Sequence, residues 1–201
     1  IRDLRMSRGL GDVYKRQSVY GGGEGQNTFV RDNIDVTIGT QEEGPNISGN
    51  VYGGSAFGTV NATNTSESTN AKTVNVTVNN GNITGDVFGG AKGDASSTPK
   101  VKGKITVNIN GGTIANVYGG FDANGTPENE DIVYLNGGII GQAFGGGKNT
   151  SQTNTNIYLK GAQVDYIYGG SNQSGLVNLT NVYIESGNAN HAFGGNNLGG
   201  T

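Results

Sequence analysis

The sequence contains no cysteine and no tryptophan, and histidine occurs once, at His191. Without cysteine, the chain can form neither a thiolate zinc site nor a cysteine nucleophile. Hydrophobic residues make up 32% and charged residues 14% of the 201 residues. Disordered chains combine low hydrophobicity with high net charge, so this composition does not indicate disorder. It also differs from the composition of an ordinary compact enzyme.

Positive charge and long apolar runs are scarce as well. The formal net charge is −3, which gives no electrostatic basis for binding nucleic acid. No apolar run approaches the roughly 18 residues that a membrane-spanning helix requires. We therefore expect no membrane-spanning segment in this chain.

Residues 1–17, IRDLRMSRGLGDVYKRQ, differ from the rest of the chain. They hold five basic and two acidic residues, whereas the remaining chain has Arg31 as its only arginine. The GDVYKRQ stretch resembles the translated adaptor read-through found at the ends of metagenomic reading frames. The alternative is a genuine basic, disordered arm. In either case we predict a single repeat domain over residues 18–201, truncated at both ends.

Glycine is abundant, with 38 residues, and much of it recurs in one motif. An aromatic residue followed by two glycines occurs seven times, as in NVYGG, DVFGG and QAFGG. The aromatic residues are Tyr20, Tyr52, Phe88, Tyr118, Phe144, Tyr168 and Phe193. The later copies follow at about 25 residues, and polar insertions over 61–72 and 91–104 lengthen the earlier units. Such insertions predict loops on one side of a stacked array.

A short β-branched run precedes each later aromatic residue. The runs are 34–38, 74–78, 105–109, 132–135, 157–159 and 182–184. Their alternating pattern predicts strands, and the NG, GG or SG that follows them permits a positive φ. Units of about 25 residues with two or three short strands fit the coils of a solenoid, whereas a propeller blade needs four strands in roughly 40 residues. We therefore predict an all-β fold, a β-solenoid (β-helix) of about six to seven short coils with Gly-Gly corners.

These Gly-rich units resemble the VYGGG repeats of surface and adhesin-like proteins of gut bacteria. The resemblance covers nearly all of residues 19–201. It implies a β-solenoid architecture and an extracellular or bacterial cell-surface location, and it is only weakly specific for function.

Strand alternation separates inner from outer side chains in each run. The aliphatic pairs, such as Val107 and Ile109, should line the core. The residue between each pair should point outward, and this outer column reads Thr37, Thr77, Asn108, Tyr134, Tyr158 and Tyr183. The three tyrosines form the candidate contact site. They could stack against sugar rings, stabilise the sheet through cross-strand pairs, or be covered by another protein layer.

The aromatic residues of the glycine motif are harder to orient. Alternation in ITGDVF and IIGQAF points them away from the core, whereas the alternation in the later copies is reversed. Seven exposed aromatic residues in line would promote association. We therefore expect these rings to pack at a corner of the coil.

No constellation of catalytic residues emerges from the repeat. Asp35, Asp86, Asp131 and Asp165 occupy different positions in their units, so no two carboxylates share a column on adjacent coils. The acidic loop over 121–131 and the GGEGQNTF stretch over 22–29 offer oxygen ligands to calcium, but neither matches a complete calcium motif. We assign no catalytic, cofactor-binding or metal-binding residue, and no cofactor.

The sequence thus predicts a non-enzymatic function. The first hypothesis is a structural and adhesive repeat region of a secreted or cell-surface bacterial protein, acting as a rigid spacer with a lateral contact surface. Glycans or host surface proteins are the expected partners, together with self-association through the solenoid ends. The alternative is a carbohydrate-binding solenoid that uses Tyr134, Tyr158 and Tyr183, and a polysaccharide-degrading enzyme ranks third.

Overall fold

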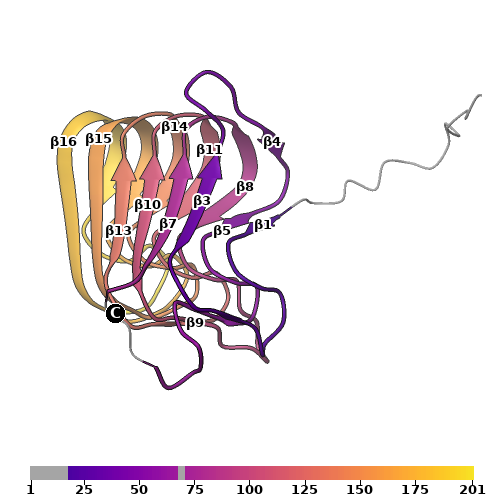
Figure 1. Cartoon of the computed structure of the whole chain (residues 1–201). Coiled ribbons are helices and arrows are strands. Elements are labelled where there is room, and N and C mark those ends of the chain that lie inside the picture. Colours follow the sequence, from indigo (N-terminus) through magenta and orange to yellow (C-terminus); the bar gives the residue numbers. More distant parts are fainter. Residues whose placement is uncertain (1–17, 68–70) are drawn as a thin grey trace, which may run out of the picture.

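The computed structural model describes residues 18–67 and 71–201, and in these ranges every regular element is a β-strand. Residues 1–17, which we expect to be adaptor read-through or a disordered arm, lie outside the described residues. Figure 1 shows strands stacked side by side in one large, strongly curved sheet. None of the described residues belongs to a helix that is long and apolar enough to cross a membrane.

One half of the large sheet contains the strands that lead into the aromatic–glycine motif. These strands are β1 (Val19–Tyr20), β4 (Asn46–Ile47), β5 (Val51–Tyr52), β8 (Asn82–Phe88), β11 (Thr113–Tyr118) and β14 (Ile139–Phe144). They pair in parallel, and from β1 through β5, β8 and β11 to β14 each aromatic residue lies beside the next. The short strand β4 pairs with β8 and has no aromatic residue. The motif therefore occupies the same register position in each of these paired strands.

The other half of the large sheet contains the predicted β-branched runs. Its strands are β3 (Ile34–Ile38), β7 (Thr73–Val78), β10 (Lys104–Ile109) and β13 (Asp131–Leu135). Two 17-residue strands, β15 (Gln152–Tyr168) and β16 (Val177–Phe193), continue through both halves. The strand order is β1-β5-β8-β11-β14-β15-β13-β10-β7-β3, with β16 beside β15 and β4 beside β8.

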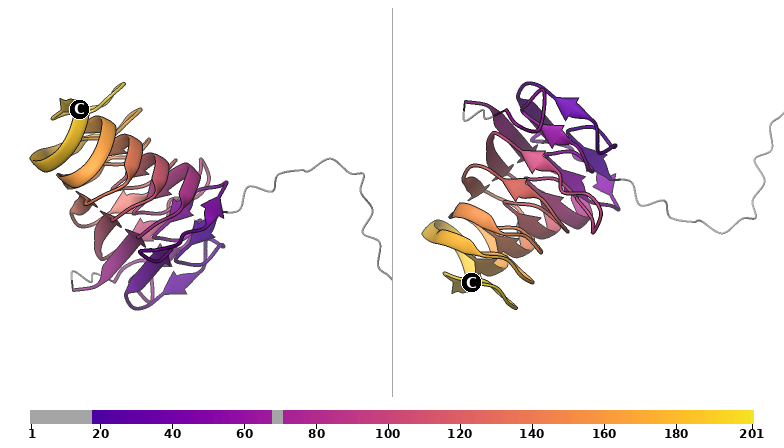
Figure 2. Two further views of the ribbon diagram at one scale, coloured as in Figure 1. Left: turned by 90° about the horizontal axis from the view of Figure 1, so that it is seen from above. Right: turned by 90° about the horizontal axis from the view of Figure 1, so that it is seen from below.

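A second, smaller sheet adds a further side to the repeats. It consists of β2 (Phe29–Val30), β6 (Thr59–Val60), β9 (Lys100–Val101) and β12 (Thr126–Pro127), again in parallel. Figure 2 shows the repeats stacked in sequence order along one axis, so that β1 and β16 lie at opposite ends. The all-β, parallel, β-helix-like architecture expected from the sequence is thereby confirmed at this level.

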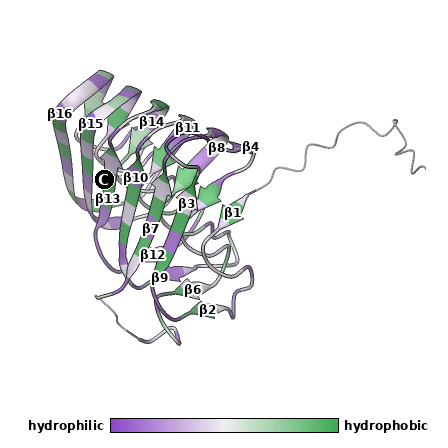
Figure 3. Cartoon of the chain, turned by 45° about the horizontal axis from the view of Figure 1, so that its top comes forward, coloured by the Kyte–Doolittle hydropathy of each residue, from purple (hydrophilic) through white to green (hydrophobic). Residues whose placement is uncertain are grey.

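The core consists of the aliphatic residues that alternation placed inside. Val107, Ile109, Val133 and Leu135 are fully buried, as are their counterparts on β7 and on β15. Figure 3 shows the resulting stripes of apolar and polar residues across neighbouring strands. Ile184 is 56% exposed although its column is buried elsewhere, because β16 pairs with β15 on one side only.

Glycines that follow the strands have two different roles. Gly112 and Gly138 follow β10 and β13 with φ of 89° and 88°, a left-handed conformation that glycine adopts without strain. Gly119, in the aromatic–glycine motif, is required for a different reason. A Cβ atom on it would lie 2.2 Å from the carbonyl oxygen of Gly145 in the next repeat. The motif thus allows successive backbones to approach closely.

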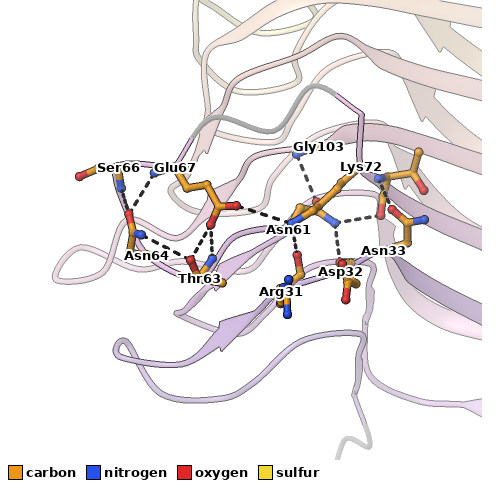
Figure 4. A network of polar contacts seen from close by, with 11 residues as sticks. Arg31, Asp32, Asn33, Asn61, Thr63, Asn64, Ser66, Glu67, Lys72 and Gly103 are labelled. Atoms are coloured by element: carbon orange, nitrogen blue, oxygen red, sulfur yellow. Dashed lines mark hydrogen bonds and ion pairs between the residues drawn. The ribbon is translucent and has the colours of Figure 1, made fainter.

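A buried asparagine ties the long polar insertion to the repeats (Figure 4). Asn61 has a φ of 64°, and its side-chain amide donates to the carbonyl oxygens of Asp32 and Thr73 at 2.9 and 3.0 Å. Its side-chain oxygen accepts from the Gly103 amide at 3.2 Å. Because these partners belong to three successive repeats, Asn61 acts as a polar link between them.

Candidate functional site

The structure places the three predicted tyrosines directly beside one another. Strand pairing aligns Asn108 with Tyr134, Tyr134 with Tyr158, and Tyr158 with Tyr183. The ring centroids of Tyr134 and Tyr158 are 5.0 Å apart, and those of Tyr158 and Tyr183 are 4.4 Å apart, with interplanar angles of 28° and 9°. We call these three residues the tyrosine file.

The tyrosine file exposes mainly ring edges, together with the outer face of Tyr183. At centroid distances of 4.4–5.0 Å the inner faces cover one another, and no sugar ring fits between them. Lys160 adds a positive charge, because its Nζ lies 5.2 and 5.4 Å from the centroids of Tyr134 and Tyr158. Desolvation, together with the neighbouring Tyr183 and Tyr134, raises the pKa of Tyr158.

The seven motif residues form a second and longer array, which we call the aromatic stack. Their successive centroids are 4.7–5.2 Å apart, and the rings are nearly parallel. The five inner rings, from Tyr52 to Tyr168, are buried and form a cluster distinct from the aliphatic core. The preceding residues, such as Val87 and Val117, join the aliphatic core instead. The rings thus lie on the other side of the sheet from the core and are nevertheless buried.

Polar side chains cover the edge of the aromatic stack. The Tyr52 hydroxyl donates to Asp122 Oδ2 at 2.8 Å and accepts from the Asn50 amide at the same distance. Further along the stack, Asp86 accepts from Asn116 at 2.7 Å and from Lys148 at 3.1 Å. Burial raises the pKa of Asp122, and the pKa of Tyr52 is raised by burial as well.

The sequence did not predict that Asp86 and Asp122 belong to one cluster. Asp86 lies two residues before its aromatic residue, whereas Asp122 lies four residues after its own. Alternation along single columns does not pair them, because the two residues occupy different columns and only the folded chain brings both near Lys148. The sequence does contain a sign of this cluster. In most repeats a polar residue stands two positions before the aromatic residue, and another stands four positions after it. Both carboxylates accept hydrogen bonds from protein donors, so the cluster resembles a structural network more than an acid–base pair.

The acidic loop over 121–131 does not gather its carboxylates. Asp122 contacts Tyr52, Glu128 pairs with Lys102, Glu130 pairs with Lys104, and Asp131 is buried in the core. Within residues 18–67 and 71–201, no group of three or more His, Cys, Asp or Glu side chains is placed to hold a metal ion. The single imidazole, of His191, is exposed and stacks on Tyr166 at 4.6 Å.

The fold and these arrays define a class of protein, namely a repeat protein of stacked parallel β-strands with continuous side-chain arrays along its axis. No known protein family, curated protein or solved structure matches this chain.

Proposed function

We propose that the chain is a structural and adhesive repeat region of a secreted or cell-surface bacterial protein, built as a solenoid of about six to seven coils with Gly-Gly corners. In this role it acts as a rigid spacer with a lateral contact surface. The observation that carries the proposal is the aromatic stack, which continues without a break from Tyr20 to Phe193. An unbroken stack beside continuous strand ladders resists bending between repeats.

Asparagine ladders support the same interpretation. Asn136 donates to Asn110, and Asn110 donates to Asn79, each at 2.9 Å. Each such bond links one repeat to the next on the outer surface. The stability of stacked repeats is approximately the sum of the intrinsic stability of each repeat and of the interfaces between neighbouring repeats. Many such contacts therefore hold the repeats together as a stiff rod without a large globular core.

The test of the spacer is a truncation that removes β15 and β16 by ending the chain after residue 151. A solenoid should remain folded and lose the length of two strand spacings, about 10 Å at roughly 4.8 Å per strand. Circular dichroism checks the fold, and small-angle X-ray scattering checks the maximum dimension. Complete unfolding of the shortened chain would contradict the solenoid proposal. Adhesion is tested separately, by the binding of protein-coated beads to host epithelial cells.

Carbohydrate binding through the tyrosine file is the second candidate. It is supported by the exposure of Tyr183, at 42%, and by the charged pair of Lys160 and Glu185 beside the rings. Hydroxyl groups, ring edges and the outer face of Tyr183 could contact a glycan chain that lies across the strands. Glycan-array binding should be lost when all three tyrosines are changed to alanine and retained in part when they are changed to phenylalanine. Binding that survives the triple alanine change would eliminate this candidate.

Two further parts of the proposal concern self-association and catalysis. The exposed residues Ile184 and Phe193 on β16 support self-association through the solenoid ends, which light scattering over a range of concentrations would detect.

Polysaccharide cleavage ranks last, because Asp86 and Asp122 both accept hydrogen bonds from protein donors. Turnover of pectin-like or host glycans by the purified chain would reverse this ranking.

A further inference from the structure

One carboxylate lies in the core without any partner. Asp131 is the first residue of β13 and has no exposed surface. Within the described part of the chain, neither of its carboxylate oxygens has a hydrogen-bond partner, and the side-chain oxygen Oε1 of buried Gln152 has none either. A buried acceptor without a donor is destabilising, and an unpaired buried charge is more so.

The column that contains Asp131 changes character along the stack. The aligned residues in earlier repeats are Ile34, Val74 and Ile105, and those in later repeats are Thr155 and Thr180. Asp131 therefore lies at the step from aliphatic to hydroxyl side chains.

The two threonines show what this position does when it is polar. The hydroxyl group of Thr155 donates to the carbonyl oxygen of Gly169 at 2.6 Å, and that of Thr180 donates to Gly194 at 2.5 Å. In both cases the acceptor is the first glycine of the motif, fourteen residues later. Fourteen residues after Asp131 lies Gly145, the first glycine of its own motif. The position thus calls for a donor, which an ionised carboxylate cannot supply and a carboxylic acid can.

We propose that Asp131 is a proton-binding site in the core, a neutral carboxylic acid whose O–H group donates where later repeats use a threonine hydroxyl. Two acceptors are candidates for this O–H group. One is the carbonyl oxygen of Gly145, which is spaced from Asp131 as Gly169 is from Thr155, and the other is the unpaired Oε1 of Gln152. Asp131 and Gln152 are close, because a Cβ atom on Gly120 would lie 3.0 Å from Asp131 Oδ2 and 2.3 Å from Gln152 Nε2. Those two atoms are therefore no more than 5.3 Å apart.

The neighbouring charges favour the neutral form. Ahead of β13, Glu130 repels a second negative charge, while Glu128 pairs with Lys102. On β10, Lys104 is engaged by Glu130. On β15, Thr155 and Gln152 face Asp131 without charge, and Lys160 lies over the rings of the tyrosine file. Burial, and to a lesser extent Glu130, raises the pKa of Asp131 well above its ordinary value of 3.8.

The stability of the fold should consequently fall as the pH rises. Above the ordinary pKa of 3.8 the unfolded chain releases the Asp131 proton, whereas the folded chain keeps it until the raised pKa is reached. In this window the unfolded state binds fewer protons, so the folding equilibrium constant falls by up to about tenfold per pH unit. Asp131 by itself thereby makes the fold less stable at neutral pH than at acidic pH.

The test compares the full chain with Asp131→Asn, Asp131→Thr and Glu130→Gln by denaturant unfolding between pH 4 and pH 9. Asparagine keeps the shape and donates a hydrogen bond without titrating, and threonine copies the later repeats. We expect the ratio of folding constants between Asp131→Asn and the parent chain to rise by tenfold or more from pH 4 to pH 7. Glu130→Gln is the control and should keep most of the pH dependence of the parent.

A direct measurement does not depend on any variant folding. In the chain labelled with ¹³C at aspartate carboxyl groups, the Asp131 resonance should keep the chemical shift of a protonated acid at pH 7. A shift typical of an ionised carboxylate would overturn the proposal. So would a stability gain with added calcium or sodium that is present in the parent and lost in Asp131→Asn, because the site would then bind a cation.

Discussion

The hydroxyl group of Tyr52 lies 2.8 Å from Oδ2 of Asp122, although the two residues are 70 positions apart. Tyr52 ends β5 and Asp122 follows β11, and β8 lies between these two strands in the sheet. Tyr118 and Asn172 repeat the relationship two repeats further on, at 2.9 Å. These bonds link repeats that share no strand pairing, so they couple the stack beyond nearest neighbours.

Changing Tyr52 to phenylalanine should destabilise the fold by about 1–3 kcal/mol, because the half-buried Asp122 carboxylate loses a donor. The pKa of Asp122 should rise further, since the hydrogen bond from Tyr52 lowers it. Denaturant unfolding gives the stability, and ¹³C NMR of the carboxyl group gives the pKa. Tyr134→Phe, in the tyrosine file, is the control and should change stability by no more than about 0.5 kcal/mol. Equal stability of the two variants would argue against a coupling role for Tyr52.

Gly119→Ala and Gly194→Ala test the close approach of backbones in the motif. An added Cβ on Gly119 would lie 2.2 Å from the Gly145 carbonyl oxygen, whereas nothing lies within 4 Å of one on Gly194. The first change should therefore cost about 2 kcal/mol or more through strain, and the second should be nearly neutral. Thermal unfolding of both variants decides the matter. A mild effect at Gly119 would show that adjacent repeats can separate without loss.

The two lysine–glutamate pairs near β10 should differ in their contribution to stability. The Lys102 side chain is 5% exposed beside Glu128, whereas that of Lys104 is 43% exposed beside Glu130. Glu128→Gln leaves a buried ammonium group without its counter-charge and should cost about 2–4 kcal/mol. Glu130→Gln should cost at most about 1 kcal/mol. Urea unfolding at low and high salt measures both, and similar losses at the two positions would contradict the assignment by burial.

Alternation along the strands allowed most of the aliphatic core to be predicted residue by residue, and Ile184, on the last strand, is the exception at 56% exposed. Val107 and Ile109 face inward because neighbouring strand residues point to opposite sides, and a parallel ladder repeats that choice in every unit. The same rule places Tyr134, Tyr158 and Tyr183 in one outer column. It did not reveal that their rings would cover each other's faces, because ring orientation depends on the distance between paired strands and on the packing of neighbouring side chains.

Local sequence alone therefore determined the repeat, the all-β class and the inner and outer columns of the β-branched runs, since these follow from spacing and alternation. The burial of the motif rings, from Tyr52 to Tyr168, was decided by the tertiary structure. Tertiary structure decided the contacts between the aromatic stack and the residues that follow the aromatic–glycine motif. There Asp122 meets Tyr52, and Asp86 meets Lys148, across columns that are far apart in sequence. It also decided the environment of Asp131, whose carboxylate oxygens are buried without a hydrogen-bond partner in the described part of the chain. Burial and partner geometry are properties of the stacked repeats together, and no single repeat contains them.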